Sequence, residues 1–169
     1  DGWPDLYVAV FRSENRLFIN DQQGGFIESN NSDIRDEGEA FGAATGDIDN
    51  DGDLDLLFAA GGGTGSKFRS GILLNLGNGE FLDVTEGIGL EALTSSNLFS
   101  GVNLADIDND GDLDIAAGWS PSLFFLNQGD GTFIDHSLGS GLKSRSLFTI
   151  LFGDFDLDGF LDILGGGGG

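Results

Sequence analysis

One nine-residue pattern of carboxylates constrains this chain more than any other feature. The pattern Asp-x-Asp-x-Asp-Gly-x-x-Asp recurs in a fixed register, and successive copies of its glycine are 50, 59 and 48 residues apart. The full copies are residues 47–55, 106–114 and 154–162, and the second half of a further copy is residues 1–5. Self-similarity at such a spacing is typical of repeat architectures. We therefore interpret the whole chain as successive copies of one structural unit.

Each unit contains four short segments with β character. An apolar segment precedes the Asp loop and three β-rich segments follow it, separated by Gly, Asp and Asn turns. Four short strands per repeat are typical of a propeller blade, and no segment has a helical apolar period long enough to indicate a helix. We predict an all-β fold of four-stranded antiparallel propeller blades. The predicted units are residues 1–46, 47–105 and 106–153, with a partial unit at 154–169.

Charge and composition exclude several functional classes. The chain has 29 acidic and 7 basic residues, and its formal net charge of -22 repels nucleic acids and anionic membrane surfaces. No apolar run approaches the roughly 18 residues of a membrane helix, so we expect no membrane insertion. Cysteine is absent and there is one histidine, which excludes disulfides and thiolate chemistry and argues against imidazole metal sites.

The Asp loop itself predicts a metal site. Carboxylates at positions 1, 3 and 5, with Gly at position 6, converge on one point, and oxygen ligands in a flexible loop suit Ca²⁺. Position 7 is variable, as expected where the backbone carbonyl is the ligand, and position 9 is Asp in every copy. An EF-hand needs Glu at position 12, where this chain has Phe58, Ala117 and Gly165. Solvated Asp-rich turns are the alternative, and three full copies in one register argue against it.

The same residues resemble a known family. The Asp pattern, the segment from Leu123 to Phe133 and the Phe-Gly-x-x-x-Gly-Asp phrase at residues 41–47 resemble the FG-GAP/VCBS repeat, which includes the integrin α-chain propeller. The resemblance covers essentially the whole chain. It implies about three blades of a larger propeller, which we expect to have seven blades, or of an open array. It also implies structural calcium in about three full sites and one truncated site.

Carried over position by position, the resemblance assigns the calcium ligands. Positions 53, 112 and 160 would contribute backbone carbonyls. The assigned residues are Asp47, Asp49, Asp51, Asp53 and Asp55; Asp106, Asp108, Asp110, Asp112 and Asp114; Asp154, Asp156, Asp158, Phe160 and Asp162; and, in the truncated copy, Asp1 and Asp5.

A partner is expected on the face opposite the Asp loops. Strands in a blade alternate in direction, so the loops between second and third strands share a face with the connections between units. All seven Lys and Arg residues fall in these loops. We predict that a protein or polysaccharide binds there; the alternative is that the aromatics pack between blades and the basic groups are solvated. The predicted contact residues are Arg12, Arg16, Lys67, Phe68, Arg69 and Trp119.

These features favour a non-catalytic, calcium-binding recognition or adhesion module of an extracellular or cell-surface protein. Millimolar calcium outside cells would fill such loops, and Asn30-Asn31-Ser32 is a glycosylation sequon at Asn30. A structural subunit that self-associates through open blade edges into a fibre or surface layer is the alternative. A polysaccharide lyase ranks last, because no acid–base pair lies outside the metal loops.

Overall fold

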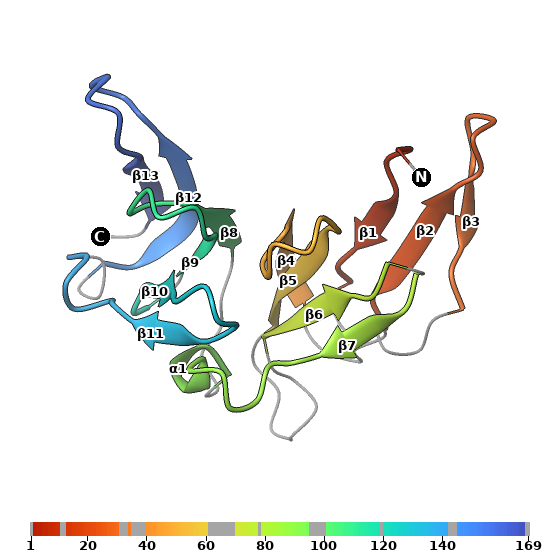
Figure 1. Cartoon of the computed structure of the whole chain (residues 1–169), viewed down its shortest axis with the longest axis horizontal. Helices are drawn as coiled ribbons and strands as arrows, with labels where there is room; N and C mark the ends of the chain where they lie inside the picture. Colours follow the sequence, from red (N-terminus) through yellow and green to blue (C-terminus); the bar gives the residue numbers. More distant parts are fainter. Residues whose placement is uncertain are drawn as a thin grey trace.

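Antiparallel strands form four separate sheets along an open arc (Figure 1). The computed structural model describes residues 2–10, 13–30, 34, 40–60, 70–77, 79–94, 101–118, 120–141 and 145–167. Sheet 1 contains β1 (Leu6–Val8), β2 (Arg16–Asn20) and β3 (Phe26–Glu28). Sheet 2 contains β4 (Ala40–Gly46), β5 (Asp55–Ala60), β6 (Gly71–Asn75) and β7 (Phe81–Asp83). Sheet 3 contains β8 (Val102–Ala105), β9 (Asp114–Ala117), β10 (Leu123–Asn127) and β11 (Phe133–Asp135), and sheet 4 contains β12 (Leu147–Gly153) and β13 (Asp162–Gly167).

The predicted all-β fold of antiparallel, propeller-type blades is confirmed. In every sheet the strands lie in chain order, and each strand pairs antiparallel with the next. Sheets 2 and 3 are complete four-stranded blades. Sheet 1 corresponds to the last three strands of such a blade, and sheet 4 corresponds to the first two. Each full Asp loop joins the first strand of a sheet to the second.

Side chains alternate between the two faces of each strand, and this alternation stacks the sheets face to face. In sheet 2, Leu56, Phe58 and Leu73 pack toward sheet 1, whereas Leu57 and Ile72 pack toward sheet 3. Sheet 3 repeats the pattern: Ile115 and Phe125 face sheet 2, and Ala116 and Phe124 face sheet 4. The hydrophobic core is therefore three successive layers, one between each pair of neighbouring sheets.

The first strands β4, β8 and β12 line the concave side of the arc. A shallow groove of about 460 Å³ runs along them and is lined by small residues such as Ala43, Ala44 and Gly101. At Gly101 the strands β8 and β12 approach closely, because a Cβ atom added there would lie 3.1 Å from the Phe148 carbonyl oxygen.

One helical turn was not predicted from the sequence. Helix α1 (Glu91–Thr94) lies in the connection from sheet 2 to sheet 3, and the buried Leu90 and Leu93 side chains pack into the core between these sheets. A single turn is too short to show a helical period, which explains why pattern analysis misses it. The described part of the chain has no helix with the length and apolarity needed to cross a membrane.

Candidate metal centres

The structure brings three carboxylates together in each full Asp loop. In every cluster, one carboxylate oxygen from each residue lies within 4.8 Å of the other two. The clusters contain the residues at positions 1, 3 and 9 of the loop: Asp47, Asp49 and Asp55; Asp106, Asp108 and Asp114; Asp154, Asp156 and Asp162. Residues far apart in the loop thus meet at one point, three times over.

Position 1 folds the loop back on itself. The Asp47 carboxylate accepts hydrogen bonds from the backbone N–H groups of Asp51 (3.0 Å) and Gly52 (3.1 Å). Asp106 and Asp154 make the equivalent bonds in their loops. The turn also needs left-handed backbone at position 6, where Gly52 has φ 97°, a conformation that glycine adopts without steric cost.

The aspartate at position 9 links the loop to the sheet by hydrogen bonds. Asp55 is fully buried; its Oδ2 accepts from the Ile48 N–H (2.7 Å) and its Oδ1 accepts from the Asn75 N–H (2.9 Å). Asp114 makes the same two bonds with Ile107 and Asn127, both at 2.9 Å. One carboxylate therefore connects the carboxylate cluster, the loop and the end of the third strand.

In the clusters of sheets 2 and 3, the aspartates at positions 3 and 9 have raised pKa values. Burial raises the pKa of Asp55 and Asp114, against the opposing effect of the hydrogen bonds they accept. Burial also raises the pKa of Asp49 and Asp108, and the neighbouring carboxylates at position 5 raise it further. Oxygen-only donors under mutual repulsion fit a hard divalent cation and are compatible with Ca²⁺.

The structure places positions 5 and 7 differently from positions 1, 3 and 9. The position 5 carboxylates lie outside the clusters and accept the backbone N–H of position 7, as Asp51 does from Asp53 at 2.9 Å. The Asp53 side chain points toward the next turn, where a Cβ atom added at Gly77 would lie 2.7 Å from its Oδ2. The remaining position 5 bonds are Asp110 with Asp112 (3.0 Å) and Asp158 with Phe160 (2.8 Å).

The truncated copy is described only in part. Asp5, at position 9, is exposed and accepts the Asn20 N–H at 2.8 Å, as its buried counterparts accept from Asn75 and Asn127. Asp1 lies outside the described residues. A metal role for Asp1 and Asp5 stays a prediction.

Asparagine at the end of the third strand is a site residue that the sequence analysis missed. The Asn127 Nδ2 donates to the Ile48 carbonyl of the neighbouring sheet (3.1 Å) and to the Leu113 carbonyl (3.2 Å). Asn75 and Asn20 make the corresponding bond within their own sheets. The signal was available, because Asn closes this strand in all three units that contain it.

Adjacent Asp loops also contact each other. The Asn50 Nδ2, at position 4, donates to Asp112 Oδ1 in the next loop (2.6 Å), and the Asn109 Nδ2 donates to the Gly159 carbonyl (3.3 Å). Both asparagines have positive φ, 61°, which Asn tolerates better than most residues. The Asp loops therefore form a connected row along one face.

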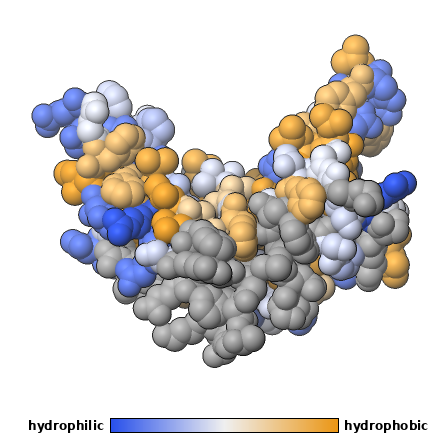
Figure 2. Space-filling view, turned by 180° about the vertical axis from the view of Figure 1, so that it is seen from behind, coloured by the Kyte–Doolittle hydropathy of each residue, from blue (hydrophilic) through white to orange (hydrophobic). Residues whose placement is uncertain are grey.

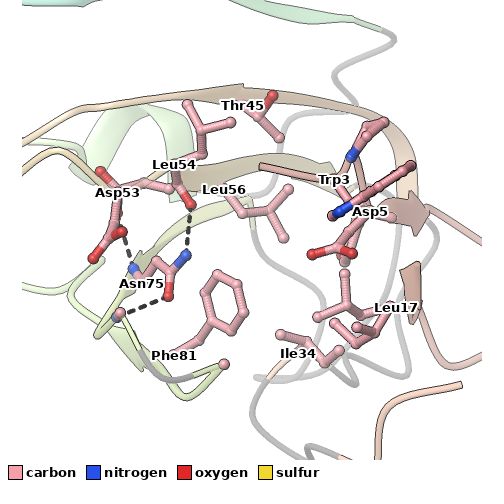
Figure 3. A pocket seen from close by; sticks show the side chains of 16 residues that line it. Trp3, Asp5, Leu17, Ile34, Thr45, Asp53, Leu54, Leu56, Asn75 and Phe81 are labelled. Atoms are coloured by element: carbon pink, nitrogen blue, oxygen red, sulfur yellow. Dashed lines mark hydrogen bonds between the residues drawn. The ribbon is translucent and has the colours of Figure 1, made fainter. Parts of the chain in front are cut away.

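A groove of about 450 Å³ lies beside this row, between sheets 1 and 2 (Figure 3). Its walls include Trp3, Leu17 and Phe81, and Asp5 lies among them. At the next interface the corresponding place is filled by the buried Ile48.

The predicted partner residues lie mostly outside the described part of the chain. Arg12, Lys67, Phe68, Arg69 and Trp119 are not described. Arg16 is exposed at the start of β2, and its Nη1 lies 3.8 Å from Glu28 Oε2. Asn30 is exposed, and the other two sequon residues are outside the described ranges. The partner face and the glycan stay predictions.

Repeated antiparallel sheets, each with its loop between first and second strands, define a β-propeller-like repeat module. The sequence model of the FG-GAP-like repeat matches residues 1–58 and 59–117. This is more than half of the chain, and the chain belongs to the FG-GAP-like repeat family. A comparison with curated proteins found no match. The predicted membership of the FG-GAP family is confirmed.

Proposed function

We propose that this chain is a calcium-binding, non-catalytic repeat module of an extracellular protein, which mediates adhesion or the recognition of a protein or polysaccharide. The observation that carries the proposal is the threefold repetition of an oxygen-only carboxylate cluster at the same place in successive sheets. A single acidic turn is common on protein surfaces. Three clusters with the same internal hydrogen bonds indicate a shared task.

The residues at positions 1, 3 and 9 would hold the cation. Bound Ca²⁺ would supply positive charge that offsets the repulsion among these carboxylates. Asp47 and its counterparts hold the loop closed through backbone N–H groups, and Asp55 and Asp114 connect their loops to the third strand. Occupancy would thus fix the turn between the first two strands of each blade.

The same clusters support the non-catalytic part of the proposal. Within the described ranges, every group of three or more close metal-ligating side chains belongs to an Asp loop. Carboxylates engaged by a structural cation are poor general acids or bases. An extracellular location fits because weak calcium sites fill at the millimolar calcium found there.

Calcium titration tests the cation role. We expect calorimetry to give about three sites per chain, and we expect the melting temperature to rise with added CaCl2 and to fall on chelation. Magnesium is the control, because its small octahedral shell suits these loops less well. A melting temperature that is the same with CaCl2 and with excess chelator would overturn the calcium assignment.

Recognition needs a separate test on the opposite face. Charge reversal at Lys67 and Arg69 is expected to abolish binding to a ligand found on a glycan or protein array. The matched control is Arg145→Glu, a solvent-exposed arginine of the same face. Binding that survives the Lys67 and Arg69 changes would remove this surface from the proposal.

A self-assembling structural subunit is the second candidate function. The observation that favours it is the exposure of large hydrophobic side chains on both end sheets, including Leu6, Phe26, Leu151 and Leu164. Extended exposed apolar patches on a soluble domain mark interaction surfaces.

A further inference from the structure

We propose that neighbouring Asp loops bind Ca²⁺ cooperatively, and that the hydrogen bond from Asn50 to Asp112 couples the loop at residues 47–55 to the loop at 106–114. Both loops belong to complete four-stranded sheets, sheets 2 and 3. The inference rests on the proposed calcium function and goes beyond it, because independent sites would need no contact between loops. Asn50 and Asp112 are then positioning residues, each of which acts on a carboxylate cluster through the backbone of its own loop.

The contact itself joins residues that are 62 positions apart in the chain. The Asn50 Nδ2 lies 2.6 Å from the Asp112 Oδ1. A hydrogen bond to an ionised acceptor is shorter and roughly twice as strong as a bond between neutral groups. This contact is therefore the strongest kind of link that an uncharged side chain can make to the next loop.

In the first loop, Asn50 lies between two attachments to the carboxylate cluster. It directly follows Asp49, which is a member of the cluster. It directly precedes Asp51, whose N–H donates to the Asp47 Oδ1 at 3.0 Å, and Asp47 is also a member. Any change in the order of this cluster therefore reaches the Asn50 amide through the backbone on both sides.

In the second loop, Asp112 is attached to its own cluster in the same way. It follows Gly111, whose N–H donates to the Asp106 Oδ2 at 3.0 Å, and Asp106 is a cluster member. The Asp112 N–H donates to the Asp110 Oδ1, also at 3.0 Å. The path from Asp49 to Asp106 therefore contains only peptide links and the two hydrogen bonds Asn50–Asp112 and Gly111–Asp106.

The Asp112 carboxylate is also held from its other side. A Cβ atom added at Gly129 would lie 2.5 Å from the Asp112 Oδ2. Glycine thus allows the turn after β10 to approach this carboxylate closely. Asp112 therefore presents its Oδ1 to Asn50 from a confined position, and the acceptor does not depend on Asn50 for its placement.

The next pair of loops repeats the contact with a different acceptor. The Asn109 Nδ2 donates to the Gly159 carbonyl at 3.3 Å, and Asn109 has the same φ of 61° as Asn50. Position 7 of that loop is Phe160, which has no side-chain acceptor. Because the acceptor is neutral and the distance is longer, we expect weaker coupling there.

The loop contact differs in kind from the rest of the junction between sheets. The core between sheets 2 and 3 consists of apolar side chains, and hydrophobic residues also lie on both arms of the arc (Figure 2). Apolar packing is non-directional. A hydrogen bond between loops instead depends on the exact position of its donor, so it can report to one loop whether the other is ordered.

Ordering and electrostatics act in opposite directions on the second binding event. Occupancy of one loop would order its position 4 amide, which lowers the cost of ordering the next loop and gives positive cooperativity. The added positive charge opposes this, and salt screens that repulsion. Each of the two loops has five aspartates and no basic residue, so an occupied loop stays negative. We therefore expect the ordering effect to dominate in physiological salt.

Calorimetric titration with CaCl2 tests the coupling on the full-length chain. Asp154→Asn with Asp156→Asn weakens the third loop, so that the two loops of sheets 2 and 3 are titrated. These loops have the same nine-residue sequence, which makes their binding constants directly comparable. We expect binding at one loop to raise the affinity of the other by about fivefold. Asn50→Gly in this background should bring that factor close to one, because glycine keeps the left-handed backbone and changes no charge.

The matched control removes a hydrogen bond between sheets that involves no Asp loop. Asn103→Ala loses the bond from Asn103 Nδ2 to the Ile150 carbonyl (3.2 Å), which joins β8 to β12, and should leave the coupling factor unchanged. If Asn50→Gly also leaves it unchanged, the loop contact is only structural and the inference is overturned, while the calcium function stands. A parent chain that binds no Ca²⁺ would overturn both.

Exchange of donor and acceptor gives a rescue test. Asn50→Asp places a second carboxylate against Asp112 and should abolish the coupling, although Asp tolerates the left-handed backbone. Adding Asp112→Asn restores one donor and one acceptor and returns the net charge to that of the parent. The double variant should recover most of the coupling, and failure to recover it would contradict the assignment to this bond.

Hydrogen exchange supplies a readout that does not depend on fitting an isotherm. Asp108→Asn weakens the second loop, and CaCl2 is then added at a concentration that fills the first loop. We expect slower exchange of the Gly111 and Asp112 N–H groups when Asn50 is present, and no slowing in the Asn50→Gly variant. Equal exchange rates in the two proteins would overturn the coupling mechanism.

Discussion

The last two aspartates of the loop, at positions 7 and 9, differ in what their side chains contact. Asp55, at position 9, is buried and accepts two backbone hydrogen bonds while also belonging to the carboxylate cluster. Asp53, at position 7, lies outside the cluster and points toward Gly77. The sequence already separates these two positions, because position 7 varies among the copies and position 9 is Asp in each. The Asp55 side chain is therefore placed to bind a cation in the cluster, whereas the Asp53 side chain is not.

This difference predicts unequal effects of the same substitution. Asp55→Asn replaces a clustered carboxylate oxygen with an amide, and we expect the affinity of that loop for Ca²⁺ to fall by about tenfold or more. Asp53→Asn should change the affinity by no more than about twofold, because only the backbone carbonyl is expected to bind there. Calorimetric titration of both variants checks this, and the first should lose one of three sites. Equal losses would contradict the assignment of position 7 to its backbone.

At the scale of the elements, the contact between neighbouring loops supports the stacking of sheets 2 and 3. Asn50 contributes a hydrogen bond to Asp112 and adopts a left-handed backbone conformation at φ 61°. Two substitutions separate these contributions. Glycine removes the hydrogen bond and keeps the backbone free, whereas alanine removes the bond and also strains the turn.

We therefore expect Asn50→Ala to be more damaging than Asn50→Gly. The predicted losses in free energy of unfolding are about 2 kcal/mol for alanine and about 1 kcal/mol for glycine. Denaturant unfolding in the absence of metal measures both, and retained strand signals in circular dichroism serve as the control for the fold. If the two variants lose equal stability, backbone strain at this position is not the cause.

The elements also show what sequence patterns can and cannot predict. The Asp loop, the four-strand unit and the family follow from repetition, because recurring positions report a shared structure. The hydrogen bond from the Asn75 N–H to the Asp55 carboxylate could not be predicted from composition, because it depends on which strand lies beside the loop. Helix α1 is too short to show a helical period in the sequence. The contact of Asn50 with Asp112 could not be predicted from repetition, because it joins residues of different units.

At the scale of the whole molecule, the acidity is concentrated in the Asp loops. Burial raises the pKa of Asp49, Asp55, Asp108 and Asp114, and nearby carboxylates add to this effect. Asp21 and Asp130 behave oppositely, because hydrogen bonds from their turns lower the pKa. The contributions of the loop carboxyls and of the turn carboxyls to folding stability therefore change in opposite directions with pH.

The metal-free protein should become more stable as the pH falls from neutral. A raised folded-state pKa contributes stability that is fully present below the unfolded pKa, about 3.9 for Asp, and that is lost as the pH rises through the folded value. The turn aspartates lose their contribution only as the pH falls through their lowered values. Between neutral pH and about pH 4 the loop carboxyls therefore set the slope.

Bound calcium should reverse the sign of this dependence of stability on pH. A cation favours the ionised carboxylates, so acid releases it and the stability it contributes is lost as the pH falls. Melting temperatures of metal-stripped and calcium-loaded protein, followed from neutral pH to about pH 4, measure both slopes. Asp49→Asn with Asp108→Asn is the control: it removes two of the raised carboxyls and should flatten the metal-free profile. If the melting temperature changed with pH in the same direction in both forms, the loop carboxyls would not govern how the stability of this fold depends on pH.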